Sequence, residues 1–237
     1  MRVLVFDIWG ATAHFRRYDT TSSPLTWPFP PRPTVFGLLG AISGLDKRTY
    51  LDRFQDAGVR VAVGIASAGR AVRVPFNEPD TKKRKDGYIE GRTRIGRELL
   101  FDPRYRLFVS LPDREFFDDL ASRIREHRCE YTVSLGQAWN LADFRFVDER
   151  DAVQRPLDDG GESVATVAPA AGLRAGDGRA LLVRRVPRHM TSDRVVREYA
   201  DVLCSEPGRE EHFRVFPVEG ATVEGLDCGD AGVAVPL

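Results

Sequence analysis

The chain begins with a nearly continuous apolar run, and a change of pattern marks each predicted element after it. Residues 2–9, RVLVFDIW, are rich in β-branched and aromatic side chains and predict a buried strand. Five prolines lie between positions 24 and 33, which predicts an ordered loop because proline fixes φ and donates no backbone hydrogen bond. Apolar residues then recur at helical spacing over 34–45, so a helix is expected to begin behind Thr34 as its N-cap residue.

The middle of the chain alternates between strand-like and charged segments. Residues 59–66, VRVAVGIA, have the pattern of a strand, and RAVRVPFN from Arg70 is expected to extend that strand or to pair with it. The densely cationic segment 82–99 carries Asp-Gly and Glu-Gly turn signals, which favour a β-hairpin that projects from the body. A further strand is predicted over 100–111, and a helix with one apolar face follows Pro112.

This order of elements indicates an α+β fold. Strand, helix, strand, insertion, strand and helix predict a ferredoxin-like βαββαβ domain over 1–150, with the inserted hairpin at about 77–99. Residues 151–237 alternate short apolar runs with Gly, Pro and Asp turns, which indicates a smaller, β-rich C-terminal lobe. Within that lobe only DRVVREYADVL, residues 193–203, is expected to be helical.

Composition is typical of a soluble globular protein and gives no sign of a polyanionic partner. Of 237 residues, 42% are hydrophobic and 30% charged, and equal totals of 35 for Lys+Arg and Asp+Glu give a formal net charge of +0. Any nucleic-acid surface must therefore be local. Three widely spaced cysteines, without a P-loop, zinc or HExxH pattern, predict a cytoplasmic protein with no metal or cofactor, and the short apolar start predicts no membrane anchor.

Positive charge is nevertheless concentrated in one segment. Only Asp86 and Glu90 interrupt the cations between positions 82 and 97. Such a local field suits contact with phosphates, and the release of counterions makes such binding salt-dependent; a solvated charged hairpin is the plainer interpretation. The predicted RNA-binding residues of this segment are Lys82, Lys83, Arg84, Lys85, Arg92, Arg94 and Arg97.

Two further places offer groups to an RNA strand. Arg16 and Arg17 lie among aromatic residues after the first strand, and because an unpaired guanidinium is rarely buried, at least one should meet a phosphate or a partner's carboxylate. Arg32 and Thr34 lie at the start of the predicted helix, where free N–H groups and the helix dipole favour an anion. We expect these cations and the nearby aromatic rings to line a single groove.

Three motifs occur in a fixed order along the first 150 residues: FDIWGATAHFRRYDT, RPTVFGLLGAISGL and SLGQAWNLADF. In the last of them the missing side chain of Gly136 lets a backbone approach, and the Gln137 amide is able to read a base edge. Together they resemble the fifth Cas protein family, the handle-capping subunit of type I CRISPR Cascade complexes, whereas the last third of the chain is similar in strand content only. The matching positions are Gly10, Ala13, Phe15, Arg16, Pro33, Thr34, Gly37, Leu38, Leu39, Gly40, Ala41, Gly44, Leu135, Gly136 and Gln137.

The resemblance implies a RAMP-type fold and a function in guide-RNA binding. In this family a ferredoxin-like core with a thumb hairpin, here at about 77–99, binds the repeat-derived 5′ handle of the guide RNA as a non-catalytic subunit, in antiviral defence. The implied partners are the guide RNA, the large subunit, the first backbone subunit and target DNA near the PAM. A type I-B-like complex with a separate processing nuclease is expected.

Two other functions stay open at this point. Family members of the type I-C kind cut precursor CRISPR RNA themselves, and metal-independent cleavage needs a general acid or base and a cation for the developing charge. His14, Tyr18 and Lys47 are the residues that would supply this chemistry. The remaining alternative is a ferredoxin-like protein unrelated to RNA, whose basic hairpin only keeps it in solution.

Overall fold

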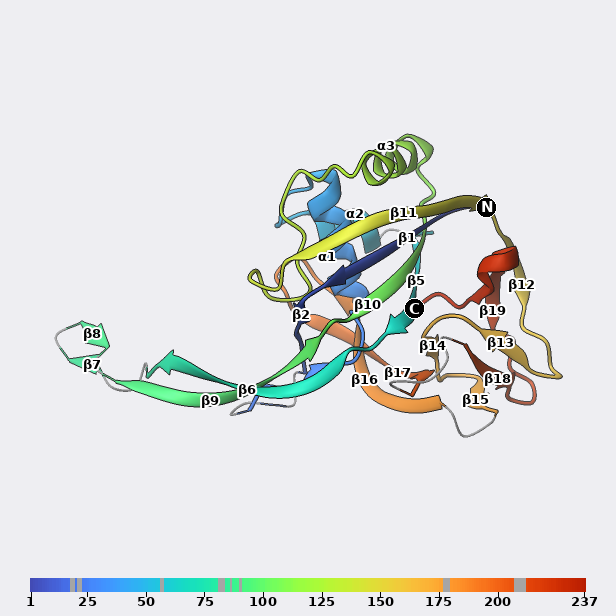
Figure 1. Cartoon of the computed structure of the whole chain (residues 1–237). Coiled ribbons are helices and arrows are strands. Elements are labelled where there is room, and N and C mark those ends of the chain that lie inside the picture. Colours follow the sequence, from blue (N-terminus) through green and yellow to red (C-terminus); the bar gives the residue numbers. More distant parts are fainter. Residues whose placement is uncertain are drawn as a thin grey trace.

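The computed structural model shows a mixed α/β protein that consists mostly of strands, with few helices (Figure 1). It describes residues 1–17, 20, 23–55, 58–80, 84–85, 87–89, 91–176, 180–206 and 212–237, without the side chains of Gln55, Arg84 and Lys85. Among these residues, no helix combines the length and the apolar character needed to cross a membrane.

A four-stranded antiparallel sheet forms the centre of the molecule, with the strand order β11-β1-β10-β5. The helices gather on one face of this sheet (Figure 1), where their apolar side chains share one core with it. α1 and α2 connect β1 to β5, and α3 connects β10 to β11. The bounds of these elements are β1 (Arg2–Gly10), α1 (Arg32–Ser43), α2 (Tyr50–Gln55), β5 (Arg60–Ser67), β10 (Arg104–Ser110), α3 (Arg114–Arg125) and β11 (Ala142–Asp151).

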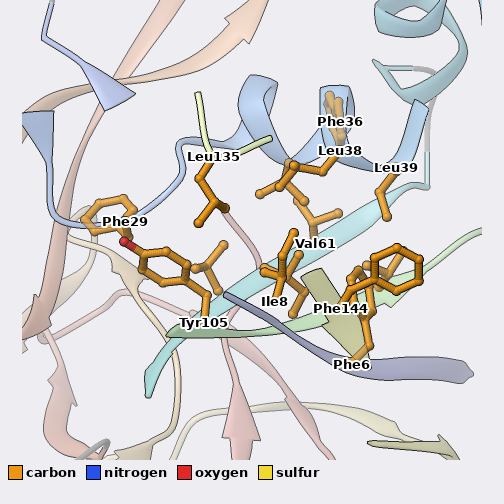
Figure 2. Packing of buried hydrophobic residues seen from close by; sticks show 14 of the residues in the cluster. Phe6, Ile8, Phe29, Phe36, Leu38, Leu39, Val61, Tyr105, Leu135 and Phe144 are labelled. Atoms are coloured by element: carbon orange, nitrogen blue, oxygen red, sulfur yellow. The ribbon is translucent and has the colours of Figure 1, made fainter. Parts of the chain in front are cut away.

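Both faces of β1 are buried, which explains why its sequence is nearly continuous in apolar residues. Successive side chains of a strand point to opposite faces. Phe6 and Ile8 pack under the helices (Figure 2). On the other face, Val3 and Val5 pack in a separate cluster that includes Leu226 from the C-terminal part of the chain. The central sheet is therefore covered on both sides.

α1 begins at Arg32 with Pro31 as its N-cap residue, so the expected N-cap position of Thr34 is wrong. Proline suits the first helical turn, because its φ is already helical and its missing N–H would have no partner there, and Pro33 occupies that turn. No side chain caps the helix, and the Thr34 N–H donates instead to the Pro31 carbonyl at 2.8 Å. α1 ends at Ser43, and the left-handed φ of 76° at its C-cap residue, Gly44, favours glycine.

A long hairpin leaves the body between β5 and β10 (Figure 1). Its strands β6 (Arg70–Pro79) and β9 (Arg92–Phe101) pair along their whole length, and β7 (Arg84–Lys85) pairs with β8 (Tyr88–Ile89) at the far end. The segment from Arg70 thus belongs to the hairpin, which begins earlier than the expected 77–99. The strand predicted over 100–111 is divided near Asp102, whose φ of 55° turns the chain from β9 into β10.

Short strands fill the rest of the molecule. β2 extends the base of the hairpin by pairing with β9, and β3 pairs with β4. The C-terminal part forms two sheets, with the orders β14-β17-β16 and β12-β19-β20-β13-β18-β15. The bounds are β2 (Thr12–Ala13), β3 (Phe15–Arg16), β4 (Thr26–Trp27), β12 (Val153–Pro156), β13 (Glu162–Val164), β14 (Ala168–Pro169), β15 (Leu173–Ala175), β16 (Ala180–Met190), β17 (Val196–Ser205), β18 (Phe213–Pro217), β19 (Glu224–Asp227), the 3-10 helix η1 (Gly229–Ala231) and β20 (Val233–Ala234).

The helix expected over 193–203 is wrong, because most of this segment is the strand β17, paired antiparallel with β16. Val202 and Cys204 of β17 share one face of the strand and are buried in the same core as α1. Pairing with β16 and burial of residues 202–205 thus override a local pattern that also suits a helix. Since the C-terminal part supplies side chains to the central core, the domain division at residue 150 stays a prediction.

Candidate nucleic-acid interface

A cavity of about 300 Å3 lies between α1, the loop before β11 and the end of β16. α1 contributes Thr34 and Gly37 to its lining, and the loop contributes Ser134 and Gly136. Two predicted site residues from distant parts of the sequence, Thr34 and Gly136, therefore line the same cavity. The other lining residues are Pro33, Leu38, Ala41, Tyr50, Thr132, Met190 and Arg194.

The loop that carries Gly136 approaches the segment after β1 so closely that position 136 has no room for a side chain. A Cβ there would lie 2.0 Å from the His14 carbonyl oxygen, and the φ of 94° favours glycine. The His14 N–H donates to the Leu135 carbonyl at 3.0 Å, and the Thr12 hydroxyl donates to the buried Asn140 side chain at 2.7 Å. Packing of two backbone segments thus explains the glycine, whose own backbone is exposed at the cavity.

Tyr50 and Arg194 form a further wall of the cavity. The Tyr50 ring lies against α1 where Gly37 and Gly40 leave room for it, and a Cβ on Gly40 would lie 3.2 Å from the Tyr50 Cβ. The Arg194 guanidinium lies 4.9 Å from the centroid of this ring and donates to the Tyr50 hydroxyl and, at 2.9 Å, to the Lys47 carbonyl. These contacts fix a positive charge at the cavity. Sequence reasoning missed Arg194, because it lies in a turn after β16 and no local motif marks it.

Arg97 is held at the base of the hairpin by partners from two other segments. Its side chain is 12% exposed, and its guanidinium donates to Glu78 at 2.7 Å and to the Gln137 side-chain oxygen at 2.9 Å. The same group lies 4.9 Å from the Phe76 ring centroid and 5.3 Å from that of Trp139. Arg97 and Gln137, both predicted to bind RNA, are therefore bonded to each other, and Arg97 links the hairpin to the loop before β11.

The arginines of β9 lie on two faces of the hairpin. Because side chains alternate along a strand, Arg92 and Arg94 share one face and Arg97 points to the other. Arg92 and Arg94 are exposed, as is Arg73, which packs over Gly96 on the same face. The expectation that all these cations line a single groove is wrong, since Arg97 is separated from Arg92 and Arg94 by the backbone of the hairpin.

The tip of the hairpin holds the remaining predicted cations of this segment. Figure 1 shows β7 and β8 at the end of the hairpin farthest from the sheet. Lys82 and Lys83 lie outside the described residues, while Arg84 and Lys85 form β7, with side chains that are not described. A contact of these four residues with RNA stays a prediction.

Arg16 and Arg17 lie near the hairpin base, whereas Arg32 lies apart from the cavity at Thr34. β3 ends at Arg16 and pairs with β4, which contacts β9. Arg16 is exposed, and the Arg17 guanidinium lies 4.8 Å from the Trp27 ring centroid. Two positions along a helix turn a side chain by about 200°. Arg32 therefore lines a different cavity from Thr34, and its contact with RNA stays a prediction.

His14 is buried, which removes it from contact with an RNA strand in this structure. It is 1% exposed, and its Nδ1 lies 2.6 Å from the Glu98 carbonyl oxygen. Burial lowers the pKa of His14 below its ordinary value; the Glu98 carbonyl opposes this shift, and the positive charge of Arg97 adds to it. Tyr18 lies outside the described residues, and within the described part of the chain no hydrogen bond joins His14 to Lys47.

Trp139 is an exposed aromatic residue beside the cavity. Its side chain is 56% exposed although its ring packs on Arg97, and the Phe76 ring lies 6.4 Å away at an interplanar angle of 35°. An exposed indole offers a stacking surface to an unpaired base. Sequence reasoning did not single out Trp139, because tryptophan in an apolar motif is more often a core residue and only its exposure distinguishes it.

Solved structures of CRISPR proteins share this fold. A chain of the structure described as "CRISPR RNA-guided surveillance complex" is 16% identical with a TM-score of 0.53, over 99% of this chain and 91% of that chain. A CRISPR protein from Archaeoglobus fulgidus is 14% identical with a TM-score of 0.56, over 100% of each chain. At these identities the similarity shows the fold alone. No curated protein matches the sequence.

A comparison with models of protein families identifies the family of the chain, which the shared fold alone does not. The model of the family described as CRISPR-associated protein (Cas_Cas5) matches residues 3–200, a range that includes α1, the hairpin and the loop at Gly136. The chain therefore belongs to this family, as its three motifs indicated. The type I-B-like subtype stays a prediction.

Proposed function

We propose that this protein is a non-catalytic subunit of a type I CRISPR effector complex, Cascade, and that it binds the 5′ handle of the guide RNA. Family membership supports the assignment to such a complex, as does the likeness in fold to a chain of an RNA-guided surveillance complex. One observation carries handle binding: Thr34 and Gly136, from two motifs far apart in the sequence, line one cavity beside the base of a cationic hairpin.

We also infer that the central unit is a ferredoxin-like, RAMP-type domain. The order β11-β1-β10-β5, with α1 and α3 on the two crossovers, supports this inference, because a βαββαβ chain places its first and third strands at the centre of an antiparallel sheet. The hairpin β6–β9 is then the insertion between the second and third strands. Arg97 of this hairpin is bonded to Gln137, the neighbour of the cavity residue Gly136.

The cavity suits an unpaired nucleotide. The hydroxyls of Thr34 and Ser134 both donate and accept hydrogen bonds, so they match the polar edge of a base or a ribose hydroxyl. Arg194 supplies a fixed positive charge for a phosphate. Beyond Gly136 the loop leads to Trp139, on which a neighbouring base is able to stack, while the exposed Arg92 and Arg94 offer their charges to backbone phosphates on the other face of the hairpin.

The exposed outer half of the hairpin offers a surface to the proposed partners other than the guide RNA. Its outer half extends away from the sheet with exposed residues on β6, β8 and β9, and an isolated two-stranded hairpin is marginally stable in water (Figure 1). Contact with the large subunit, the first backbone subunit or target DNA near the PAM would bury it. The type I-B-like assignment of that complex is part of the same proposal.

The alternative function, cleavage of precursor CRISPR RNA, loses its proposed general base. His14 is buried, its Nδ1 contacts a carbonyl oxygen, and its pKa is lowered by burial. A residue so placed has no access to a ribose hydroxyl without rearrangement of the loop at Gly136. We therefore place the function of the site in binding.

Filling the cavity tests this proposal. Ala41 lines the cavity on α1, so Ala41→Phe should occupy the space for a nucleotide and weaken binding of a labelled repeat-derived RNA at least tenfold in fluorescence anisotropy. Ala171→Phe, at an exposed turn outside the cavity, is the matched control and should bind as the wild type does. Equal affinity of the Ala41→Phe protein, shown to be folded by circular dichroism, would exclude the cavity as the handle site.

A further inference from the structure

A second cavity, of about 180 Å3, gathers arginines from three elements on the side of α1 that faces the C-terminal sheets. Arg32 comes from the first turn of α1, Arg60 from the start of β5 and Arg188 from β16. Three guanidinium groups thus share the described lining with one acidic side chain, that of Glu224. The other lining residues are Val59, Gln154, Leu226, Pro236 and Leu237.

Arg32 lacks the partner that a partly buried guanidinium normally has. No described carboxylate lies within ion-pair distance of it, and its Nε is buried without a hydrogen-bond acceptor among the described residues. It stacks 4.7 Å from the Phe36 ring centroid, which holds the side chain in place. Burial lowers the pKa of Arg32, and the charge of Arg188 lowers it further, although Glu198 opposes both. The guanidinium is therefore partly buried without an ion-pair partner among the described residues.

The acidic residues near this cavity already have partners. Glu198 accepts a hydrogen bond from Arg188 at 2.8 Å, and Glu224 accepts one from the Gln154 side chain. Arg60 makes no side-chain hydrogen bond or ion pair within the described part of the chain. Two guanidinium groups of the lining, those of Arg32 and Arg60, thus have no ion-pair partner among the described residues.

We propose that this arginine cavity binds a phosphate group. Guanidinium forks match the oxygens of a phosphate and give bidentate, charge-assisted hydrogen bonds, and the N-terminal end of α1 adds a favourable dipole beside Arg32. A phosphate would supply the acceptor that Arg32 Nε lacks. The phosphate comes either from the backbone of a nucleic-acid strand or from free phosphate, and both offer the same oxygens. Since the two cavities share no lining residue, this site is separate from the proposed handle site and does not depend on it.

Isothermal titration calorimetry of the full chain with inorganic phosphate, at constant ionic strength, tests the site. The wild type and Arg114→Gln, an exposed arginine of α3 outside this cavity, should bind phosphate equally. Arg32→Gln and Arg60→Gln should each weaken binding at least tenfold. Absence of saturable binding to the wild type, or equal binding by both cavity variants, would overturn the proposal.

Two further measurements define the source of the phosphate and guard against misfolding. A single-stranded oligonucleotide without the handle sequence should displace phosphate if the site takes a nucleic-acid backbone, and should leave phosphate bound if free phosphate is the ligand. Arg32→Gln removes the stack of Arg32 on Phe36 and with it a contact that supports folding. If that variant does not fold, Arg60→Gln still tests the phosphate site. Both variants should retain handle RNA binding, because neither residue lines the cavity at Thr34. If the wild type did not bind handle RNA at all, the phosphate titrations would still test the arginine cavity.

Discussion

At Gly136 a single missing side chain brings two segments of the chain together. The carbonyl of His14 occupies the place that a Cβ would take, so the turn before β11 is able to reach α1 and complete the cavity. His14 in turn is buried beneath the same loop, near Arg97. At this scale the interface is built from close backbone contacts as much as from its polar side chains.

We predict that Gly136→Ala destabilises the protein far more than Gly87→Ala. Both glycines have positive φ, 94° and 84°, but a Cβ on Gly87 meets nothing within 4 Å. Backbone strain alone should cost about 1 kcal/mol at position 87, whereas the clash with His14 should raise the loss at position 136 to about 3 kcal/mol or more. Urea denaturation of both variants measures the difference. Equal losses would mean that the loop has room to move.

Burial of His14 makes the protein less stable in mild acid. Because its pKa is lowered in the folded state, the unfolded chain binds the proton more readily, and stability is lost as pH falls through the ordinary value of about 6.5. We expect the free energy of unfolding of the wild type to decline between about pH 8 and pH 5 more steeply than that of His14→Asn. Denaturant titrations at these pH values compare the two proteins, and parallel pH profiles would contradict the assignment.

Among the elements, the hairpin β6–β9 divides its arginines between two tasks. The alternation of side chains leaves Arg92 and Arg94 exposed on one face and places Arg97 against Phe76 and Trp139 on the other. A cation that already has an ion pair and two aromatic neighbours contributes to packing. Exposed cations contribute to phosphate binding and hence to its salt dependence.

We therefore expect opposite phenotypes from the two faces. The double variant Arg92→Gln, Arg94→Gln should keep its thermal midpoint and reduce the slope of log affinity against log salt by about 0.7 for each phosphate that is no longer neutralised. Arg97→Gln should keep the slope and lower stability by about 1–3 kcal/mol, because Glu78 loses its partner. Thermal melts and RNA titrations over a salt series separate these effects. If the salt dependence of RNA affinity fell equally in the Arg92→Gln, Arg94→Gln variant and in Arg97→Gln, the two faces of the hairpin would not differ in function.

Over the whole molecule, the C-terminal part completes the central sheet. Leu226 and Ala234 cover the face of the sheet that carries Val5 and Phe108, while Val202 of β17 joins the core on the helical side. The first 150 residues alone would expose both of these contact surfaces. We infer that the two parts of the chain stabilise each other.

Leu226→Ala should consequently destabilise the central sheet as well as the C-terminal part. All three tryptophans, Trp9, Trp27 and Trp139, lie in the first 150 residues, so their fluorescence reports on that part alone. We expect a loss of about 2–5 kcal/mol in unfolding monitored by this fluorescence, against less than about 0.5 kcal/mol for Val218→Ala, where the side chain is 45% exposed. An unchanged tryptophan transition in Leu226→Ala would show independent domains.

The local sequence pattern was sufficient to predict elements whose structure depends on residues close in sequence. The apolar run of β1, the helical spacing of α1 and the turn signals of the hairpin depend on residues close in sequence, and each predicted an element that is present. The largest error lies where distant contacts decide. Residues 193–203 fit a helical pattern but form most of the strand β17, because pairing with β16 and burial against α1 favour a strand. The start of α1 moved from Thr34 to Arg32 for a local reason, the prolines of its first turn.

The sequence by itself determined which residue types and motifs the protein has: a cationic hairpin, a glycine-rich helix and an L-G-Q turn, in the order of one CRISPR-associated family. Only the tertiary structure decided how they meet. It brought Thr34, Gly136 and Arg194 to one cavity, placed an exposed Trp139 next to Arg97, and separated Arg32, Arg92 and Arg94 from the expected groove. The physical reason is that burial, pairing register and the facing of side chains depend on contacts between segments far apart in the chain, which no local pattern records.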